Sequence, residues 1–263
     1  MKLSVLMAAF NEERTIAEVT REVLAVDYPC DIELIVVDDG SSDSTPDLLA
    51  QLDDPRVTVH RHTVNRGKGA ALLTAARLAT GTYILPFDAD LEYSPEDIPR
   101  LLAPVLQKRC EVVYGARLFG FNTVYQSYRY ALGNKMTTLA ANLLFDANLA
   151  DMHTCLKLIP IDLFRSFNLR DSGFGLDTEM TAEILRRGLR PFEVPITYHS
   201  RTHSEGKKIT WQDGLECLFI LGRVRFSRQR RRSTYPRPHL RVPSAVRPAD
   251  GGGLVDTVTA EPA

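Results

Sequence analysis

Residues 82–92 read Thr82-Tyr83-Ile84-Leu85-Pro86-Phe87-Asp88-Ala89-Asp90-Leu91-Glu92, an apolar run that ends in three carboxylates. The apolar part predicts a buried strand, so Asp88 and Asp90 should stand where that strand leaves the sheet. Two carboxylates spaced by one residue at such a place can share one hard cation. Mg²⁺ and Mn²⁺ take oxygen ligands and often bridge to substrate phosphates, which suggests a metal-dependent enzyme acting on a diphosphate. A turn that simply favours Asp is the alternative interpretation, and the neighbouring segments must decide.

The rest of the chain alternates strand-like and helical patterns. Further strands are expected at residues 3–9, 32–37, 57–60, 112–114 and 192–198. Helices are expected after Asn11, Ser44, Gly69 and Ser94, and over residues 125–144, 178–187 and 211–226. This alternation predicts an α/β fold with a Rossmann-like, mostly parallel sheet flanked by helices.

The composition is typical of one large α/β domain. Of the 263 residues, 44% are hydrophobic and 25% are charged, and no apolar run is long enough to cross a membrane. No leader sequence is evident at Met1, so we expect the chain in the cytoplasm. The four cysteines lack the spacing of a metal site, and we expect reduced thiols at all of them: Cys30, Cys110, Cys155 and Cys217.

The basic residues are concentrated near the end of the chain. Residues 223–241 contain eight Arg and no Asp or Glu, although the formal net charge of the whole chain is −1. The amphipathic segment 211–226 leads directly into this stretch, which favours an interfacial helix beside anionic lipid headgroups over a core helix with a basic tail. Aromatic residues are not interleaved with the Arg cluster except Tyr235, so nucleic acid is not the expected partner. Residues 227–263 contain too few apolar residues to pack and are expected to be disordered.

Polar clusters follow several of the expected strands. Asn11 and Glu12 follow the first strand, Asp38 and Asp39 follow the second, and Asp88 follows the fourth. Open α/β sheets bind ligands at this edge, where Asp39 can hold a ribose or a base or can simply form an Asp-Gly turn. The segment Asn65-Arg66-Gly67-Lys68-Gly69 lacks the spacing of a P-loop, and it predicts a glycine turn with one cation, Lys68, facing a diphosphate.

Taken in order, these motifs resemble those of the family 2 glycosyltransferases with the GT-A fold, particularly the polyprenyl-phosphate (dolichol-phosphate) mannose synthase branch. The resemblance rests on four segments: Ala8-Ala9-Phe10-Asn11-Glu12, Val36-Val37-Asp38-Asp39-Gly40-Ser41, Asn65-Arg66-Gly67-Lys68-Gly69 and Asp88-Ala89-Asp90-Leu91-Glu92. It covers residues 1–226, with a nucleotide-binding part over about 1–117 and an acceptor and membrane part over about 118–226.

The resemblance implies roles for individual residues. The nucleotide-sugar would contact Ala8, Phe10, Asn11, Glu12, Asp39, Lys68, Asp88, Ala89 and Lys207. Mg²⁺ or Mn²⁺ would bind Asp88, Asp90 and Glu92, and the acceptor phosphate would bind Arg117 and Arg129. The catalytic group would comprise Asp90, Asp177, Arg117 and Arg201. The branch often has Gln-His-Pro-Pro where this chain has Glu92-Tyr93-Ser94-Pro95, so GDP-mannose and UDP-hexose donors both stay open. His153, His199 and His203 lack metal spacing and are expected to support loops.

The expected reaction is the inverting transfer of one sugar to a polyprenyl monophosphate at the cytoplasmic membrane face, where a membrane-embedded partner can use the product. A phosphomonoester is mostly dianionic at neutral pH and needs positioning rather than deprotonation. A hydroxyl acceptor, soluble or on a polysaccharide, would instead need a general base, for which Asp177 and Glu179 are the candidates. A membrane protein that binds nucleotide-sugars without turnover is the third reading.

Overall fold

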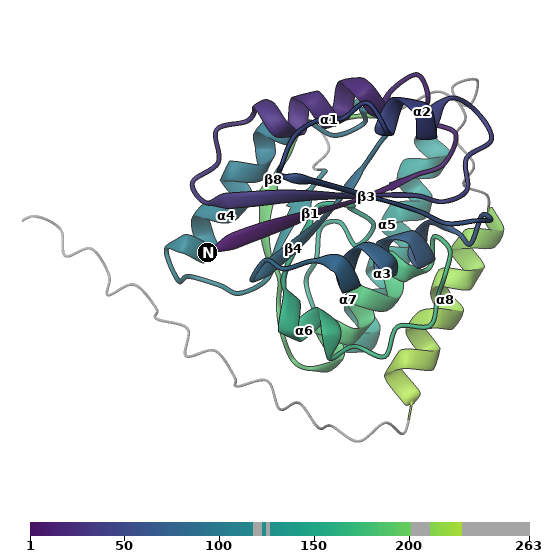
Figure 1. Ribbon diagram of the computed structural model, residues 1–263. Helices are drawn as coiled ribbons and strands as arrows, with labels where there is room; N and C mark the ends of the chain where they lie inside the picture. Colours follow the sequence, from purple (N-terminus) through teal and green to yellow (C-terminus); the bar gives the residue numbers. More distant parts are fainter. Residues whose placement is uncertain (118–122, 125–126, 201–210, 228–263) are drawn as a thin grey trace, which may run out of the picture.

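A twisted seven-stranded sheet forms the centre of the molecule (Figure 1). The computed structural model describes residues 1–117, 123–124, 127–200 and 211–227. The strands, in spatial order, are β3 (Val57–Arg61), β2 (Asp31–Asp38), β1 (Lys2–Ala9), β4 (Tyr83–Asp88), β7 (Lys157–Pro160), β5 (Val113–Ala116) and β8 (Phe192–Pro195). The predicted mostly parallel α/β sheet is therefore confirmed.

Strand β7 departs from the parallel pattern and was not predicted. It lies between β4 and β5 and runs antiparallel to both, whereas β1 to β4 pair in parallel with one another and β5 pairs in parallel with β8. The segment has only four residues and begins with a lysine, Lys157. It therefore lacks the longer apolar or alternating pattern from which a strand is predicted. The insertion places residues from the second half of the chain next to β4.

One face of the sheet is covered by helices from the first half of the chain. These are α1 (Ile16–Ala25), α2 (Thr45–Leu49), the short 3₁₀ helix η1 (Pro95–Asp97) and α4 (Ile98–Leu106). Alternate residues of β1 point to this side, because a strand directs successive side chains to opposite faces. Leu3, Val5 and Met7 thus pack in one buried cluster with Ile16 and Leu101.

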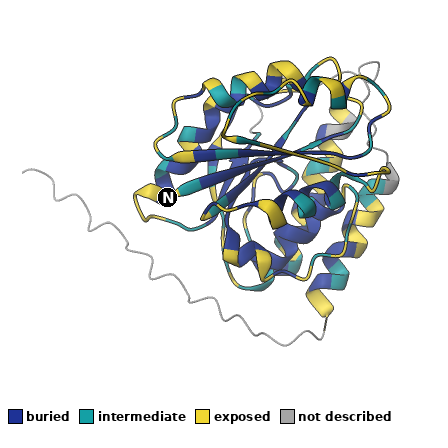
Figure 2. Cartoon of the chain, in the orientation of Figure 1, coloured by how far each residue is buried: buried dark blue, intermediate teal, exposed yellow. Residues whose placement is uncertain are grey.

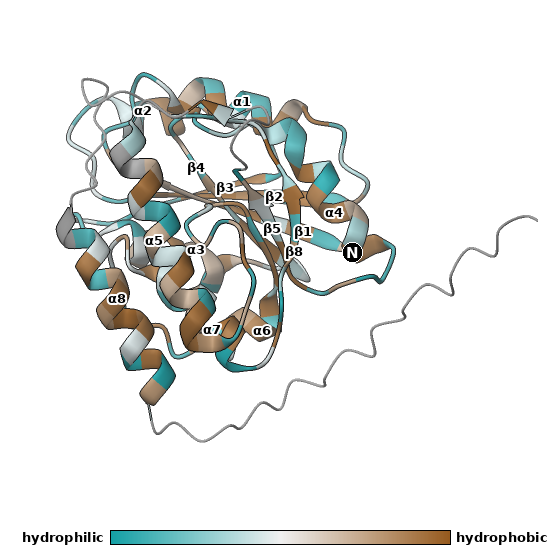
Figure 3. Ribbon diagram, turned by 180° about the vertical axis from the view of Figure 1, so that it is seen from behind, coloured by the Kyte–Doolittle hydropathy of each residue, from teal (hydrophilic) through white to brown (hydrophobic). Residues whose placement is uncertain are grey.

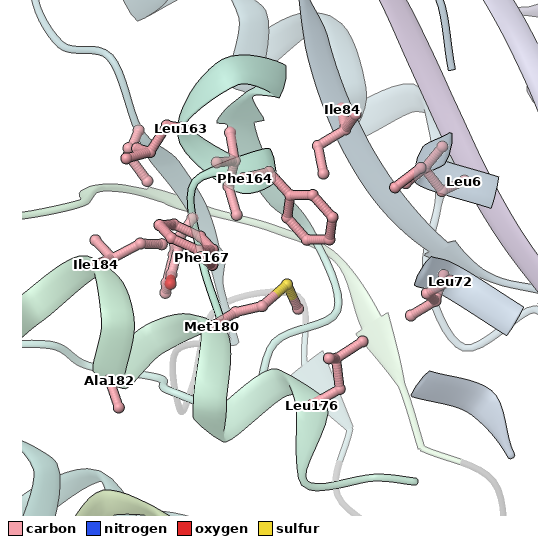
Figure 4. Packing of buried hydrophobic residues seen from close by; sticks show 14 of the residues in the cluster. Leu6, Leu72, Ile84, Leu163, Phe164, Phe167, Leu176, Met180, Ala182 and Ile184 are labelled. Atoms are coloured by element: carbon pink, nitrogen blue, oxygen red, sulfur yellow. The ribbon is translucent and has the colours of Figure 1, made fainter. Parts of the chain in front are cut away.

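The other face carries the remaining helices. These are α3 (Lys68–Leu78), α5 (Tyr128–Phe145), α6 (Ile161–Arg165), α7 (Leu176–Arg186) and α8 (Trp211–Phe226). Figure 4 shows Phe164 and Phe167, in and just after α6, beside Met180 of α7, while Leu6 of β1 faces the same cluster. The sheet is buried on both sides, as Figure 2 shows, so its edges and loops remain for ligands.

The C-terminal helix α8 has the predicted bounds, but apolar residues lie on both its buried and its exposed side. Its residues Cys217, Ile220, Leu221 and Val224 are buried, and the helix packs against α5 and α7. The opposite side is apolar as well as exposed, as the brown patches on α8 in Figure 3 indicate. The predicted disordered tail lies outside the described residues.

The strand predicted over residues 192–198 is divided in two. Strand β8 ends at Pro195, and β9 (Tyr198–His199) pairs instead with β6 (Thr123–Val124) in a second, two-stranded sheet. Proline has no N–H to continue a ladder, and the N–H of Thr197 donates to Asp97 Oδ2 at 2.6 Å. Across the described ranges, no helix combines the length and the apolar character needed to cross a membrane.

Candidate functional site

The loops that follow β1 and β2 are joined by reciprocal hydrogen bonds. The N–H of Asn11 donates to Ser41 Oγ at 2.9 Å, and the N–H of Ser42 donates to Asn11 Oδ1 at 2.9 Å. Asn11 has a positive φ of 56°, a conformation that Asn adopts more readily than most residues. The N–H of Glu12 donates to Thr45 Oγ1 at 2.9 Å. The first two predicted nucleotide-binding motifs therefore form one connected edge.

Asp39 is the anchor of the loop that precedes α3. Its side chain is buried and accepts hydrogen bonds from the N–H groups of Arg66 (3.0 Å) and Gly67 (2.7 Å). His62 Nδ1 lies 2.6 Å from the same carboxylate, and His62 Nε2 lies 3.0 Å from Thr74 Oγ1. Asp39, predicted to contact the nucleotide, thus also binds groups within the protein, and the sequence analysis did not predict these partners.

The remaining nucleotide-binding candidates of the first motif lie at the same edge. Ala8 is in register with Asp88 of the neighbouring strand β4. Phe10 and Glu12 are half-buried in the loop after β1, and Ala89 is buried just beyond β4. The structure therefore brings the candidates from both strands together.

Lys68, the first residue of α3, forms an ion pair with Asp88. Its Nζ lies 2.6 Å from Asp88 Oδ1, and the two side chains are 22% and 21% exposed. Burial disfavours the ammonium, but the carboxylate of Asp88 more than compensates and the pKa of Lys68 lies well above its usual value. A permanent cation therefore stands at the edge where β4 ends.

The two glycines beside Lys68 permit a close approach of another loop. Gly67 has φ of 95°, and a Cβ there would lie 2.4 Å from the carbonyl oxygen of Ser172. The same oxygen accepts a hydrogen bond from the N–H of Ala70 at 3.1 Å. Gly69 meets the backbone of the same loop. These glycines let the loop 171–173, just before α7, pack against the start of α3.

Of the three predicted metal ligands, Asp88 and Asp90 form a pair, whereas Glu92 binds Tyr198. Asp88 and Asp90 are both partly accessible at the end of β4. Glu92 is buried; its Oε2 accepts the hydroxyl of Tyr198 at 2.6 Å, and its N–H donates to Asp90 Oδ1 at 3.1 Å. Within the described part of the chain, no three His, Cys, Asp or Glu side chains gather closely enough to hold a metal. Asp88 and Asp90 supply the carboxylate oxygens that Mg²⁺ and Mn²⁺ prefer, and further ligands would have to come from a substrate or from water.

The structure distinguishes the two candidate bases, Asp177 and Glu179. Asp177 is half-buried, and its Oδ1 accepts a hydrogen bond from Lys157 Nζ at 3.0 Å. Glu179 is buried and accepts the N–H of Arg170 at 2.8 Å and the guanidinium of Arg223 at 2.8 Å. Glu179 therefore joins a loop to α8, whereas the Asp177 carboxylate pairs with Lys157 and also helps to raise the pKa of Lys68.

Arg117, just after β5, is paired with the buried Asp151. Two of its N–H groups bind the two carboxylate oxygens, with Arg117 Nη2 2.9 Å from Asp151 Oδ1. Burial alone would raise the pKa of Asp151, but Arg117 and then Asn134 of α5 lower it to about 2. The guanidinium also lies over the ring of Tyr198, 4.8 Å from its centroid. The predicted acceptor-phosphate ligand is thus fixed in place and stays charged.

Several predicted residues fall wholly or partly outside the description. Arg201, Lys207 and His203 lie outside the described residues, and so does the side chain of Arg129, which belongs to α5. His199 is exposed, and His153 Nε2 lies 2.7 Å from Thr137 Oγ1.

Four residues of this region were missed by sequence reasoning: His62, Asp151, Lys157 and Tyr198. Lys157 carried a signal, because a lysine within the apolar run Leu156–Pro160 has to find an anion if the run is buried. The other three carried none, since their partners are distant in the sequence.

Comparison with known proteins identifies the family. The model of the family described as "Glycosyl transferase family 2" matches residues 4–167. The low-salt glycan biosynthesis hexosyltransferase Agl6 of Haloferax volcanii is 30% identical over 215 residues, which are 81% of this chain and 51% of Agl6. The protein MJ1222 of Methanocaldococcus jannaschii is 26% identical over 84% of this chain and 90% of its own length. The chain thus spans about half the length of Agl6.

Solved structures share the fold. Glucosyl-3-phosphoglycerate synthase from Mycobacterium tuberculosis, in complex with Mn²⁺, UDP and phosphoglyceric acid, superimposes with a TM-score of 0.64 at 21% identity. The match covers 86% of this chain and 78% of the synthase. At this identity the likeness establishes the GT-A fold alone.

Proposed function

The chain belongs to glycosyltransferase family 2, and from this premise we propose that it transfers one sugar from a nucleoside-diphosphate-sugar to a polyprenyl monophosphate, with inversion at the anomeric carbon. Sugar transfer follows from the family. The donor, which is GDP-mannose or a UDP-hexose, and the lipid acceptor are the proposal. Agl6 is named a hexosyltransferase, which supports a hexose.

The observation that carries the proposal is the Lys68–Asp88 ion pair at the edge where β1, β2 and β4 end. A nucleotide-sugar brings two phosphate charges, and the leaving nucleotide gains further negative charge as the anomeric bond breaks. Lys68 offers a fixed positive charge at this edge, where the nucleotide-binding candidates of the first motif also lie: Ala8, Phe10, Asn11 and Glu12. We assign the donor diphosphate to Lys68, and also to Arg201 and Lys207.

A divalent cation belongs to the same proposal. Asp88 and Asp90 would hold Mg²⁺ or Mn²⁺, and Glu92 would hold their loop through Tyr198 rather than complete the set of ligands. The related synthase from M. tuberculosis was crystallised with Mn²⁺ and with Mg²⁺, in each case together with UDP. When bound, the metal would offset charge on the donor diphosphate.

We assign the acceptor phosphate to Arg117, together with Arg129. Arg117 is held by Asp151 and Tyr198, so little side-chain entropy is left to lose on binding a phosphate. A phosphate nucleophile needs no base, which agrees with a site whose carboxylates pair with lysines and arginines.

A lipid acceptor is supported by what we name the α5–α8 face. Two neighbouring helices expose apolar side chains there: Leu132, Met136, Leu139 and Leu143 of α5, and Leu215, Leu218, Phe219 and Phe226 of α8. The four α5 residues follow helical spacing and form one stripe, and Figures 1 and 3 show α8 lying along α5. Asn134 of α5 also contacts Asp151, so one helix links this face to Arg117.

The arrangement fits peripheral binding to an anionic membrane surface. Apolar residues on α8 precede the Arg-rich sequence 228–232, the combination of burial and charge that holds interfacial helices. We place the enzyme at the cytoplasmic face of the cell membrane, with donor binding over about residues 1–117 and acceptor binding over about 118–226. A membrane-embedded partner that uses the product belongs to the same proposal.

Transfer of labelled sugar tests the proposal. Purified protein is incubated with each of several GDP- and UDP-sugars, Mn²⁺, and either polyprenyl phosphate or the corresponding polyprenol. We expect one donor to give a product that extracts into organic solvent, only with the phosphate. If none of the donors gives a lipid-linked product, the proposal is wrong.

Transfer to a hydroxyl is the second candidate, favoured by the half-buried Asp177 beside the donor edge. It predicts product without polyprenyl phosphate and a severe loss of rate in Asp177→Asn. In phosphate transfer the same variant should retain a larger share of its rate. The same donor panel, repeated with soluble sugars and polysaccharide, separates the two.

A further inference from the structure

Lys157 is a fully buried charge within the central sheet. It belongs to β7, between β4 and β5, and its side chain is 0% exposed. Removing an ammonium from water costs several kcal/mol unless a partner compensates.

The partners of Lys157 come from α7 and β5. Its Nζ donates to Asp177 Oδ1 at 3.0 Å and approaches the backbone oxygen of Asp177 at 3.3 Å. The ammonium also lies 5.5 Å from the ring centroid of Tyr114, whose hydroxyl is 3.0 Å from Thr181 Oγ1. Lys157 therefore fixes both the side chain and the backbone of Asp177 in the first turn of α7.

Asp177 interacts with two cations, by direct contact with Lys157 and through its charge with Lys68. Its side chain is 15% exposed, and its charge acts on Lys68 as well as on Lys157. The loop 171–173, just before α7, packs against Gly67 and Gly69, which flank Lys68. Charges of alternating sign thus run from the core to the edge in the order Lys157, Asp177, Lys68, Asp88.

We propose that Lys157 is a positioning residue that holds the Asp177 carboxylate on the core side, so that Lys68 remains available to the donor diphosphate. Without Lys157, the Asp177 carboxylate turns to its other cation, Lys68, and competes with the diphosphate for it. The inference rests on the proposed function, because it assigns the diphosphate to Lys68.

A purely structural ion pair would behave differently. Loss of Lys157 would then lower the free energy of unfolding and leave nucleotide affinity unchanged. If Lys157 positions Asp177, its loss should weaken nucleotide binding. Removing the Asp177 carboxylate as well should restore that binding.

Binding of GDP and UDP with Mn²⁺, measured by calorimetry, tests the proposal without turnover. We expect Lys157→Met, which keeps the length and the apolar contacts of the stem, to weaken binding of the preferred nucleotide about tenfold, within the usual range of coupling between neighbouring sites. The double variant Lys157→Met/Asp177→Asn should bind as tightly as Asp177→Asn alone. Lys2→Met is the matched control, since Lys2 pairs with Glu33 at 2.7 Å at the other end of β1.

Each outcome bears on the proposal. Unchanged affinity in Lys157→Met, or a double variant as weak as Lys157→Met, would overturn it. If Lys157→Met does not fold, the double variant lacks both charges, and weaker binding by it than by Asp177→Asn would count against positioning. A parent protein that binds neither nucleotide would overturn the proposed function and this inference together, a result distinct from the others.

Discussion

The donor edge and the acceptor side of this molecule are built differently. At the donor edge, formed by the loops after β1, β2 and β4 with Lys68, polar groups bind one another across short loops, as in the Asn11–Ser41 and Asp39–Gly67 hydrogen bonds. On the acceptor side, Arg117 is paired with a buried partner, Asp151, and the α5–α8 face exposes apolar side chains.

The donor edge suits a ligand of defined shape and polarity, whereas the exposed apolar face can accept a flexible hydrocarbon chain. A fixed polar edge suits a ligand with defined hydrogen-bonding groups, such as a nucleotide, since each misplaced donor is costly. An exposed apolar face with one anchored cation suits a ligand that combines a phosphate with a hydrocarbon chain. The proposed donor and acceptor correspond to these two surfaces.

The largest effect is expected at the donor edge itself. Asp88→Asn removes the partner of Lys68 and one proposed metal ligand, and we expect kcat for sugar transfer to fall about 10³-fold. Asp54→Asn, which breaks the Asp54–Arg56 pair elsewhere, is the control and should keep the rate within about twofold. A rate for Asp88→Asn close to that of the parent would remove Asp88 from the mechanism.

The next test asks whether Asp39 serves the fold or only the ligand. Asp39→Asn replaces a carboxylate oxygen by an N–H₂ group that faces the N–H donors of Arg66 and Gly67, so we expect the free energy of unfolding to fall by about 3 kcal/mol without nucleotide. Chemical denaturation measures it, with Asp31→Asn, at the exposed start of β2, as control. Unchanged stability together with weakened nucleotide binding would assign Asp39 to the ligand alone.

The donor edge was more accessible to sequence reasoning than the acceptor side for a physical reason. In a parallel sheet the carboxyl ends of strands meet at one edge, so Asn11, Asp39 and Asp88 could be brought together from strand order alone. Their internal partners could not: the Asp39–His62 contact depends on side-chain positions that no local pattern encodes.

Strand β7 is the element of the sheet that sequence reasoning missed. Because this strand lies antiparallel between β4 and β5, it brings Lys157 to Tyr114 and to the start of α7. Strand pairing between distant segments is set by global packing rather than by local propensity. By contrast α8 was predicted with the observed bounds, since its apolar pattern is local.

The α5–α8 face gives a smaller, specific effect. Leu143 and Phe219 are 76% and 70% exposed, so Leu143→Asp/Phe219→Asp should leave the thermal midpoint almost unchanged. We expect binding to vesicles that contain anionic lipid to fall about tenfold, because two apolar contacts are lost and two repelling charges are added. Val64→Asp, at a 63% exposed residue of the donor side, is the control. Equal vesicle binding by parent and double variant would refute the assignment of this face to a membrane.

The smallest effect concerns His153, which contacts Thr137 of α5 beside the Asp151 cluster. Burial lowers the pKa of this histidine from 6.5 to about 4. Between these pH values the histidine is protonated in the unfolded chain but stays neutral in the folded protein. The free energy of unfolding should therefore decrease as pH falls from 6.5 toward 4.

The variant His153→Gln removes this pH-dependent contribution. Between pH 7 and pH 5, its free energy of unfolding should fall by about 1–2 kcal/mol less than that of the parent. Denaturation at both pH values measures the difference, with the exposed His60→Gln as control for the loss of a histidine. Parallel pH dependence in parent and His153→Gln would show that the buried site tolerates a charged imidazole and that burial does not lower the pKa of His153.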